Sequence, residues 1–373
     1  MDASAGATRI RGTAGVCLTT RRLEITRAQV LAYRRTVGAL DDRLPPGADS
    51  LRHAAWAGLQ DSVPRAALLS IHARVSGTEP SAWEDSSLVQ LWGPRFSMYV
   101  VAAGDRGVFT LGRLPDTADR RRFAEDLASR LDAFLDGRRM LYGEAGRALG
   151  VHPNLLRYAA PTGRVLLRWD GSQQPTIWTV PPPDVDPFEA CLELARRYLH
   201  VFGPTTAAAF GAWAGVRPAQ ARRAFDVLAR SLTPVRTVIG DGWILAGDEP
   251  LLRASAHRAA GVRLLPSGDT YSLLKAGERE VLVPDARHRR ELWTPRVWPG
   301  ALMVEGELVG TWRRAEANVG IQPWRELSAA ERDAVEAEAE SLPLPGVAGR
   351  IRVGWGRPRQ TRTPAGGNTG VDP

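Results

Sequence analysis

One helical segment followed by an alternating segment constrains the fold of this chain more than any other feature. Pro64 suits the first turn of a helix, because that position needs no amide hydrogen, and it opens a predicted helix over 64–75. The apolar face of this helix is supplied at helical spacing by Leu68, Leu69, Ile71, His72 and Val75. Residues 88–101 then alternate and are rich in β-forming residues, which indicates a hairpin. A helix–turn–helix followed by a hairpin is a winged helix.

The same order of helices and hairpin recurs along the chain. We expect a first winged helix over 19–115, a second over 116–183 and a third over 184–250. In the first, helices are expected near 26–40, 50–58 and 64–75, and strands near 89–110. In the second, a helix through Phe134, a short helix over 143–149 and a helix from Pro153 precede a wing over 164–180.

The third unit follows the stiff segment Pro181–Pro183. Its helices are expected over 187–199, 204–214 and 217–231, and its hairpin, Thr233–Leu245, should turn at Gly240–Gly242. Residues 251–356 contain several short predicted strands separated by turns, which indicates a small β-barrel. The acidic helix Ser328–Leu342 is expected to pack on this barrel. The barrel strands are expected at Gly261–Leu265, Glu280–Val283, Ala301–Val304 and Glu307–Trp312. The ends, 1–18 and 357–373, should be flexible.

The predicted fold class is therefore α+β, with tandem winged helix–turn–helix domains followed by a small C-terminal β-barrel. The formal net charge of +8 and the pI near 10.2 favour a polyanionic partner, double-stranded DNA above all. Lys275 is the only lysine, so nearly all basic residues are arginines. Codon bias explains arginine in place of lysine, but it does not create an excess of positive charge.

Metals, cofactors and membranes are not indicated. Cys17 and Cys191 are isolated, and no paired histidines or Cys-x-x-Cys motif accompany them, so we expect neither a zinc site nor a disulfide framework. No apolar run approaches 18 residues, and the first 22 residues lack the apolar centre of a signal peptide. We expect a cytoplasmic, nucleoid-associated monomer without a small-molecule cofactor.

Five segments carry a resemblance to a known family. They are Gln60-Asp61-Ser62, Arg95-Phe96-Ser97-Met98-Tyr99, Arg196–Thr205, Leu264–Leu274 and Val304–Arg313. In this order and spacing they resemble the AlkZ-like (YcaQ-like) winged-helix DNA glycosylases. The resemblance implies hydrolysis of the N-glycosidic bond of alkylated or bulky-adduct bases by a monofunctional glycosylase. It places catalysis at the loop 60–62 and a phosphate contact at Arg95.

The loop 60–62 departs from the family pattern. Ser62 stands where the family has a second glutamine or an aspartate, and Phe96 and Tyr99 replace the glycine and histidine of the strand motif. An alkylated purine is already a good leaving group, so an amide and a carboxylate that hold water and stabilise positive charge on the sugar suffice. Gln60 would position the water, assisted by Asp61 or Ser62. The alternative is that Asp61 and Ser62 only cap the helix that follows.

Arginines on helices and wings are the candidate DNA contacts. Besides Arg95, they are Arg65, Arg157, Arg164, Arg168, Arg222 and Arg223. For any single arginine the competing interpretation is a solvated helix face. Three function classes follow, namely a DNA glycosylase, a non-catalytic regulatory DNA-binding protein, and a protein-interaction module, and the positive charge argues against the last.

Overall fold

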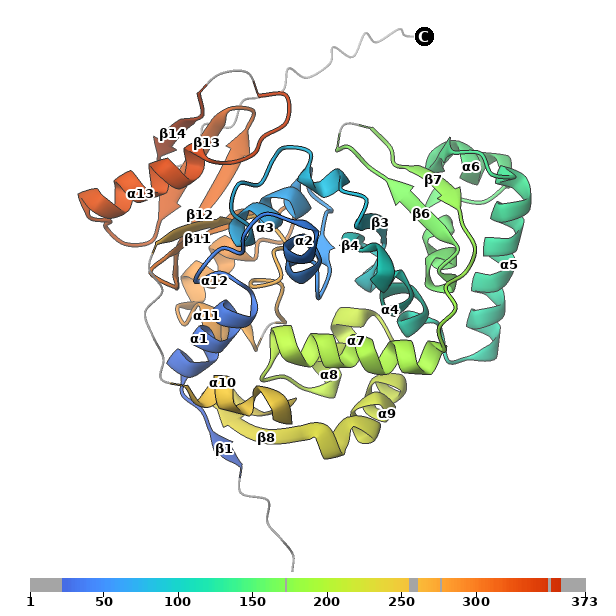
Figure 1. The fold of residues 1–373 in the computed structure, drawn as a ribbon, viewed down its shortest axis with the longest axis horizontal. Helices are drawn as coiled ribbons and strands as arrows, with labels where there is room; N and C mark the ends of the chain where they lie inside the picture. Colours follow the sequence, from blue (N-terminus) through green and yellow to red (C-terminus); the bar gives the residue numbers. More distant parts are fainter. Residues whose placement is uncertain (1–21, 172, 255–260, 276, 348–349, 357–373) are drawn as a thin grey trace, which may run out of the picture.

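The computed structural model describes residues 22–171, 173–254, 261–275, 277–347 and 350–356. The flexible ends expected at 1–18 and 357–373 lie outside these residues. The described chain has a mixed α and β fold in which the C-terminal sheet and the α5 region lie on opposite sides, with α7 beneath them in the view of Figure 1.

The first part of the chain builds the elements that hold the candidate loop. They are β1 (Leu23–Glu24), α1 (Arg27–Val37), α2 (Ala48–Ala54), β2 (Leu59–Gln60), α3 (Ala66–Arg74), β3 (Leu88–Trp92), β4 (Met98–Ala102) and α4 (Arg106–Thr110). Helix α3 begins at Ala66 and not at Pro64, because Arg65 adopts a left-handed backbone with φ 66°. The strands expected near 89–110 end at Ala102, and residues 106–110 are helical because α4 packs on α7 with Phe109 buried.

The next part packs against the first through a common sheet. Its elements are α5 (Ala118–Leu135), β5 (Met140–Leu141), α6 (Tyr142–Ala148), the 3₁₀ helix η5 (Pro153–Thr162), β6 (Val165–Arg168) and β7 (Thr176–Thr179). The helix expected from Pro153 is therefore a 3₁₀ helix, and it contains Pro161, which cannot donate an α-helical hydrogen bond. The sheet has the order β2-β4-β3-β6-β7-β5, and all its neighbouring strands are antiparallel.

Three helices and a hairpin follow, in the order expected for the third unit. They are α7 (Pro187–Phe202), α8 (Ala207–Ala214), α9 (Pro218–Leu228), β8 (Leu232–Thr237), β9 (Gly240–Leu245) and the short α10 (Glu249–Arg253). The hairpin turns at Val238 and Ile239 and not at Gly240–Gly242, since Thr237 pairs directly with Gly240. Strand β1 completes a sheet of order β1-β8-β9.

The C-terminal part is a sheet with helices beside it. Its elements are β10 (Val262–Leu265), α11 (Arg279–Leu282), α12 (Ala286–Leu292), β11 (Gly300–Val304), β12 (Glu307–Ala315), β13 (Asn318–Pro323), α13 (Ala329–Glu340) and β14 (Arg352–Trp355). Among the described residues the strands form an open sheet, β10-β11-β12-β13-β14, and no closed barrel is found. The strand expected at Glu280–Val283 is helical, because both Val281 and Leu282 are buried and the Val283 amide bonds to the Arg279 carbonyl.

One large apolar core joins most of these elements. It contains residues of α1, β4, α7, α8, α9, β9 and the segment 271–293, including the fully buried Tyr33, Tyr198 and Phe210. A second core lies between the C-terminal sheet and α13, whose start is capped by Ser328. The candidate loop therefore rests on a well-packed framework.

Candidate functional site

The loop that carries Gln60, Asp61 and Ser62 is fixed by backbone pairing. Gln60 is the last residue of β2 and lies opposite Tyr99 of β4, and the Asp61 amide donates to the Met98 carbonyl at 2.8 Å. The turn between β6 and β7 closes over the loop, since a Cβ on Gly171 would lie 2.7 Å from the Cβ of Pro64. The backbone position of the three residues is therefore fixed by the pairing of β2 with β4.

The Asp61 carboxylate points into the protein. Its Oδ1 accepts the Ala67 amide of α3 at 3.0 Å, and its Oδ2 accepts Nε2 of Gln90 at 2.7 Å. Only 1% of Asp61 is exposed. The capping interpretation therefore describes what this carboxylate does, although the helix that it caps begins at Ala66.

The buried position of Asp61 changes its acidity. Burial raises the pKa of Asp61 to about 6, while the hydrogen bonds from Ala67 and Gln90 and the nearby cations Arg65 and Arg168 pull the pKa down. Asp61 was one of two residues expected to assist Gln60, but both of its carboxylate oxygens are occupied inside the protein. Gln90, which the sequence analysis did not single out, fixes the carboxylate and also bonds to Trp169, accepting its amide at 2.7 Å.

In contrast to Asp61, Gln60 and Ser62 are not fully buried. Ser62 is exposed, and Nε2 of Gln60 donates to its hydroxyl at 3.3 Å. Oε1 of Gln60 is shielded from solvent and has no hydrogen-bond partner among the described residues. An acceptor in this state is suited to hold one ordered water.

Gly268 forms the wall beside Gln60. A Cβ on Gly268 would lie 3.3 Å from Cδ of Gln60, and its φ of +77° also favours glycine. Arg74 of α3 holds this segment in place, donating to both carboxylate oxygens of Asp269 at 2.7 and 2.8 Å. A buried ion pair thus holds the segment Leu264–Leu274 beside the candidate loop. The spacing of residues in the sequence does not reveal this ion pair.

Tyr99, in the position of the family's histidine, is completely buried. Its ring lies between Gly58 and Gly93, where a Cβ would come within 3.0 and 2.8 Å of it. Burial raises the pKa of Tyr99 to about 12. The phenol is therefore neutral at physiological pH and does not act as a base.

Two of the expected DNA contacts flank the loop. The guanidinium groups of Arg65 and Arg168 lie 4.2 and 3.9 Å from the ring centre of Trp83, and Arg168 also pairs with Glu84 at 2.9 Å. Trp83 is buried, so it is a platform for these cations and not for a DNA base. The structure brings Arg65 and Arg168 together near Asp61, as their effect on its pKa shows.

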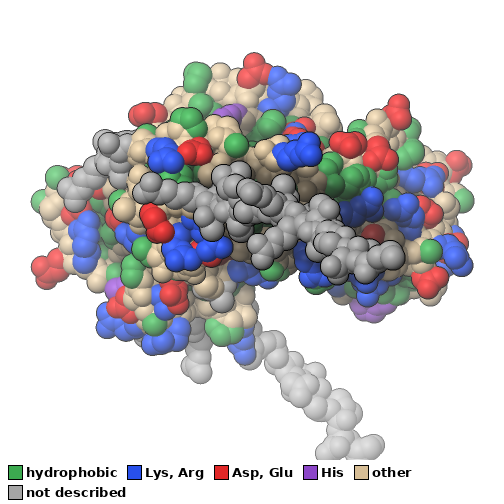
Figure 2. Space-filling model, turned by 90° about the horizontal axis from the view of Figure 1, so that it is seen from below, with side chains coloured by type: hydrophobic (Ala, Val, Ile, Leu, Met, Phe, Trp, Pro, Cys, Tyr) green, Lys and Arg blue, Asp and Glu red, His purple; other side chains and the backbone are tan. Residues whose placement is uncertain are grey.

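The other expected contacts are dispersed. Arg164 is bound to α5 through Asp132 at 2.6 Å, Arg157 lies 5.8 Å from the Tyr158 ring centre, and Arg223 lies 4.4 Å from that of Phe188. Arg222 and Arg95 are exposed. Basic side chains occur in several groups on the face shown in Figure 2, with acidic side chains among them.

Arg95 lies near two cations that the sequence analysis did not select. Burial lowers the pKa of Lys275, and the charges of Arg95 and Arg279 lower it further. A group of three like charges attracts an anion such as a phosphodiester. Lys275 stands out in the sequence because it is the only lysine of the chain, and this could have pointed to the cluster of Arg95, Lys275 and Arg279.

Neither a metal centre nor a membrane segment emerges from the part of the chain that the structure describes. No three His, Cys, Asp or Glu side chains there are grouped to hold a metal ion. No described helix combines the length and the apolar character needed to span a bilayer.

The fold is mixed α and β, and the loop presents the Gln60 amide and the Ser62 hydroxyl beside the cations Arg65 and Arg168. The chain belongs to the AlkZ-like DNA glycosylase family, whose model matches residues 53–343. The family prediction is therefore confirmed.

Two comparisons with single proteins agree with this assignment. The interstrand DNA cross-link repair glycosylase of Streptomyces sahachiroi is 22% identical over 355 residues, which cover 83% of this chain and 94% of that protein. The solved structure of Streptomyces sahachiroi DNA glycosylase AlkZ matches with a TM-score of 0.72 and 20% identity, over 89% of this chain and all of the other. This second likeness confirms a shared mixed α and β fold.

Proposed function

We propose that this protein is a monofunctional DNA glycosylase that hydrolyses the N-glycosidic bond of alkylated or bulky-adduct bases, interstrand cross-links included. The observation that carries the proposal is Oε1 of Gln60, an unpartnered acceptor on an anchored loop. Gln60 orients the attacking water, and the Ser62 hydroxyl orients the Gln60 amide. The cross-link activity is that of the Streptomyces relative, and it comes to this chain as part of the proposal.

Asp61 supports this chemistry without touching the substrate. Its carboxylate joins β2 to the first turn of α3 and to Gln90, so it is a positioning residue for Gln60. Because the alkylated purine leaves as a neutral base, a strong general base is not required, and an oriented water next to the developing positive charge suffices.

In this proposal, DNA is bound by two groups of cations. Arg95, with Lys275 and Arg279 near it, holds backbone phosphate, and Arg65 and Arg168 flank the loop. The helices and hairpins over 19–115, 116–183 and 184–250 act as winged helices. The protein works as a cytoplasmic, nucleoid-associated monomer without a small-molecule cofactor.

A base-release assay tests the proposal directly. The protein is incubated with duplex DNA that carries an N7-alkylated purine, and the free base is measured, together with the abasic site by alkaline cleavage. Wild type should release the base, and Gln60→Ala should release it roughly 10- to 1,000-fold more slowly at equal DNA affinity. DNA binding without release by wild type, and by Ser62→Gln and Ser62→Asp, would instead support a non-catalytic DNA-binding protein, for which the capping role of Asp61 is the favouring observation.

A further inference from the structure

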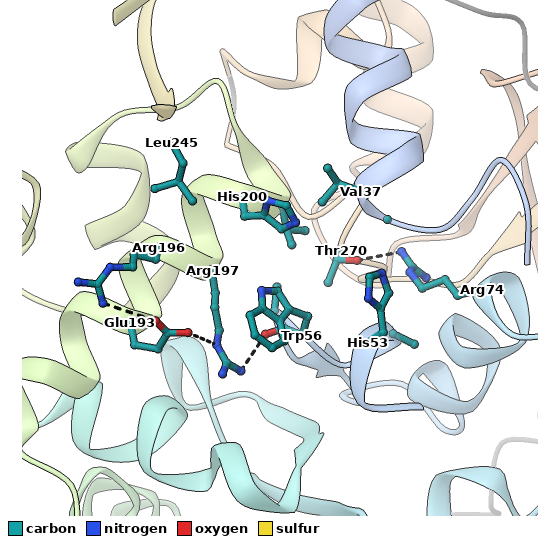
Figure 3. A pocket seen from close by; sticks show the side chains of 14 residues that line it. Val37, His53, Trp56, Arg74, Glu193, Arg196, Arg197, His200, Leu245 and Thr270 are labelled. Carbon is teal, nitrogen blue, oxygen red and sulfur yellow. Dashed lines mark hydrogen bonds and ion pairs between the residues drawn. The ribbon is translucent and has the colours of Figure 1, made fainter. Parts of the chain in front are cut away.

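A cavity of about 430 Å³ lies apart from the loop 60–62. Its walls come from the ends of α1 and α2, from the segment after α2, and from α7, as Figure 3 shows. A volume of this size is in the range of pockets for small organic ligands. Its apolar walls include Val37, Ala57, Val201 and Leu245.

Trp56 provides an aromatic platform in this cavity. Its side chain is 40% exposed, and the guanidinium of Arg197 lies 3.9 Å from its ring centre (Figure 3). Arg197 is itself held by Asp105 at 2.6 Å and by Glu193 at 2.9 Å. An exposed indole with a fixed cation beside it is preorganised to stack on a planar ring.

His200 contributes an imidazole whose orientation is fixed by Asp248. Its Nδ1 lies 3.0 Å from both carboxylate oxygens of Asp248, and the Tyr33 hydroxyl lies 2.8 Å from one of them. The carboxylate accepts the Nδ1–H of the ring, so Nε2 is the ring nitrogen left to meet a ligand. Among the described residues nothing is hydrogen-bonded to this Nε2.

The three arginines that line the cavity are paired with carboxylates. Arg74 is paired with Asp269, Arg197 with Asp105, and Arg196 lies 3.5 Å from Glu193. Burial lowers the pKa of His53, and the neighbouring His200 lowers it further. The cavity therefore offers no unpaired arginine to an anionic ligand, which favours an uncharged ligand.

We propose that this cavity binds an uncharged, amino-substituted nucleobase, which stacks on Trp56 and donates its amino group to Nε2 of His200. Binding there requires no cleavage of a glycosidic bond, so the proposal does not depend on the activity of the loop 60–62. None of the loop residues lines the cavity.

The experiment uses 2-aminopurine riboside, whose fluorescence is quenched when it stacks on an aromatic ring. Wild type should quench it saturably, and purine riboside, which lacks the amino group, should compete at least about 10-fold less well than adenosine. Trp56→Leu should weaken binding about 10-fold or more, as loss of one stacking platform does.

Val37→Phe, which fills the cavity, should abolish binding, whereas Val227→Phe on the exposed face of α9 should not. Because these two variants insert the same side chain, their comparison holds even if Trp56→Leu fails to fold. Equal quenching by Val37→Phe and wild type overturns the proposal. Equal competition by purine riboside and adenosine also overturns it, since it would mean that the amino group is not recognised.

Discussion

Arg74 and Asp269 form a buried bidentate ion pair that fixes helix α3 to the segment beside Gln60. Their side chains are 3% and 0% exposed, and Ser70 and the Tyr271 amide complete the hydrogen bonds of the carboxylate. Burial alone would raise the pKa of Asp269, but the charge and hydrogen bonds of Arg74 hold the pKa below its ordinary value. The wall of the candidate site thus depends on a contact between residues far apart in the sequence.

Breaking this pair should be costly. Asp269→Leu or Arg74→Met alone leaves one charge buried without a partner, which typically destabilises a protein by about 3 to 5 kcal/mol. The double variant should recover much of this loss, because neither charge remains. Urea unfolding of all four proteins measures the coupling, and simple additivity of the two single changes would contradict the expectation.

Gln60→Ala should lower the release of an N7-alkylated purine by roughly 10- to 1,000-fold, since the group that orients the water is lost. DNA affinity should change little. Ser62→Ala should have a smaller effect, and Ser62→Asp or Ser62→Gln should raise activity by restoring the family pattern. Gln220→Ala on α9 is the matched control, because it removes the same amide away from the loop.

Asp61 should make stability depend on pH. Its pKa rises from 3.8 in the unfolded chain to about 6 in the folded protein, so folding takes up a proton between these values. This contribution is fully present below about pH 4 and is lost as the pH rises through 6, by on the order of 3 kcal/mol. Relative to Asp61→Asn, wild type should therefore lose stability from pH 4 to pH 7. A constant difference between the two proteins would rule this out.

DNA binding should depend steeply on salt. If about five phosphates are neutralised, the slope of log K against log salt should be near −4 to −5, with little sequence preference. Arg95→Gln should reduce the magnitude of this slope by about one. Arg164→Gln should leave the slope unchanged and lower stability instead, because Arg164 is occupied by Asp132 and Ser129. No change in slope for Arg95→Gln would remove Arg95 from the DNA contacts.

Local patterns in the sequence predicted most of the helices and hairpins. The helices predicted over 187–199 and 328–342 are present as α7 and α13. The predictions failed where tertiary contacts override local preference. Residues 280–283 look like a strand but are helical, and residues 106–110 fold into α4 against α7.

The candidate site was only partly predictable for the same reason. Gln60, Ser62 and Arg95 lie in recognisable motifs, but the inward orientation of Asp61 depends on Gln90 and on the start of α3. Gly268 lies beside Gln60 because the ion pair between Arg74 and Asp269 holds its segment there. Lys275 lies near Arg95 although the two residues are far apart in the sequence. Contacts between residues far apart in the sequence leave no periodic pattern, so they could not be predicted from this one sequence.

The sheet shared by β3 and β6 makes the first two units unsuitable as separately expressed modules. Cutting the chain between them would expose the edge of β3 and strip Gln90 of its bond to Trp169. A bare strand edge invites pairing with other chains, so the fragment would aggregate before its loop could be assayed. Truncation studies should therefore keep residues 22–180 in one piece.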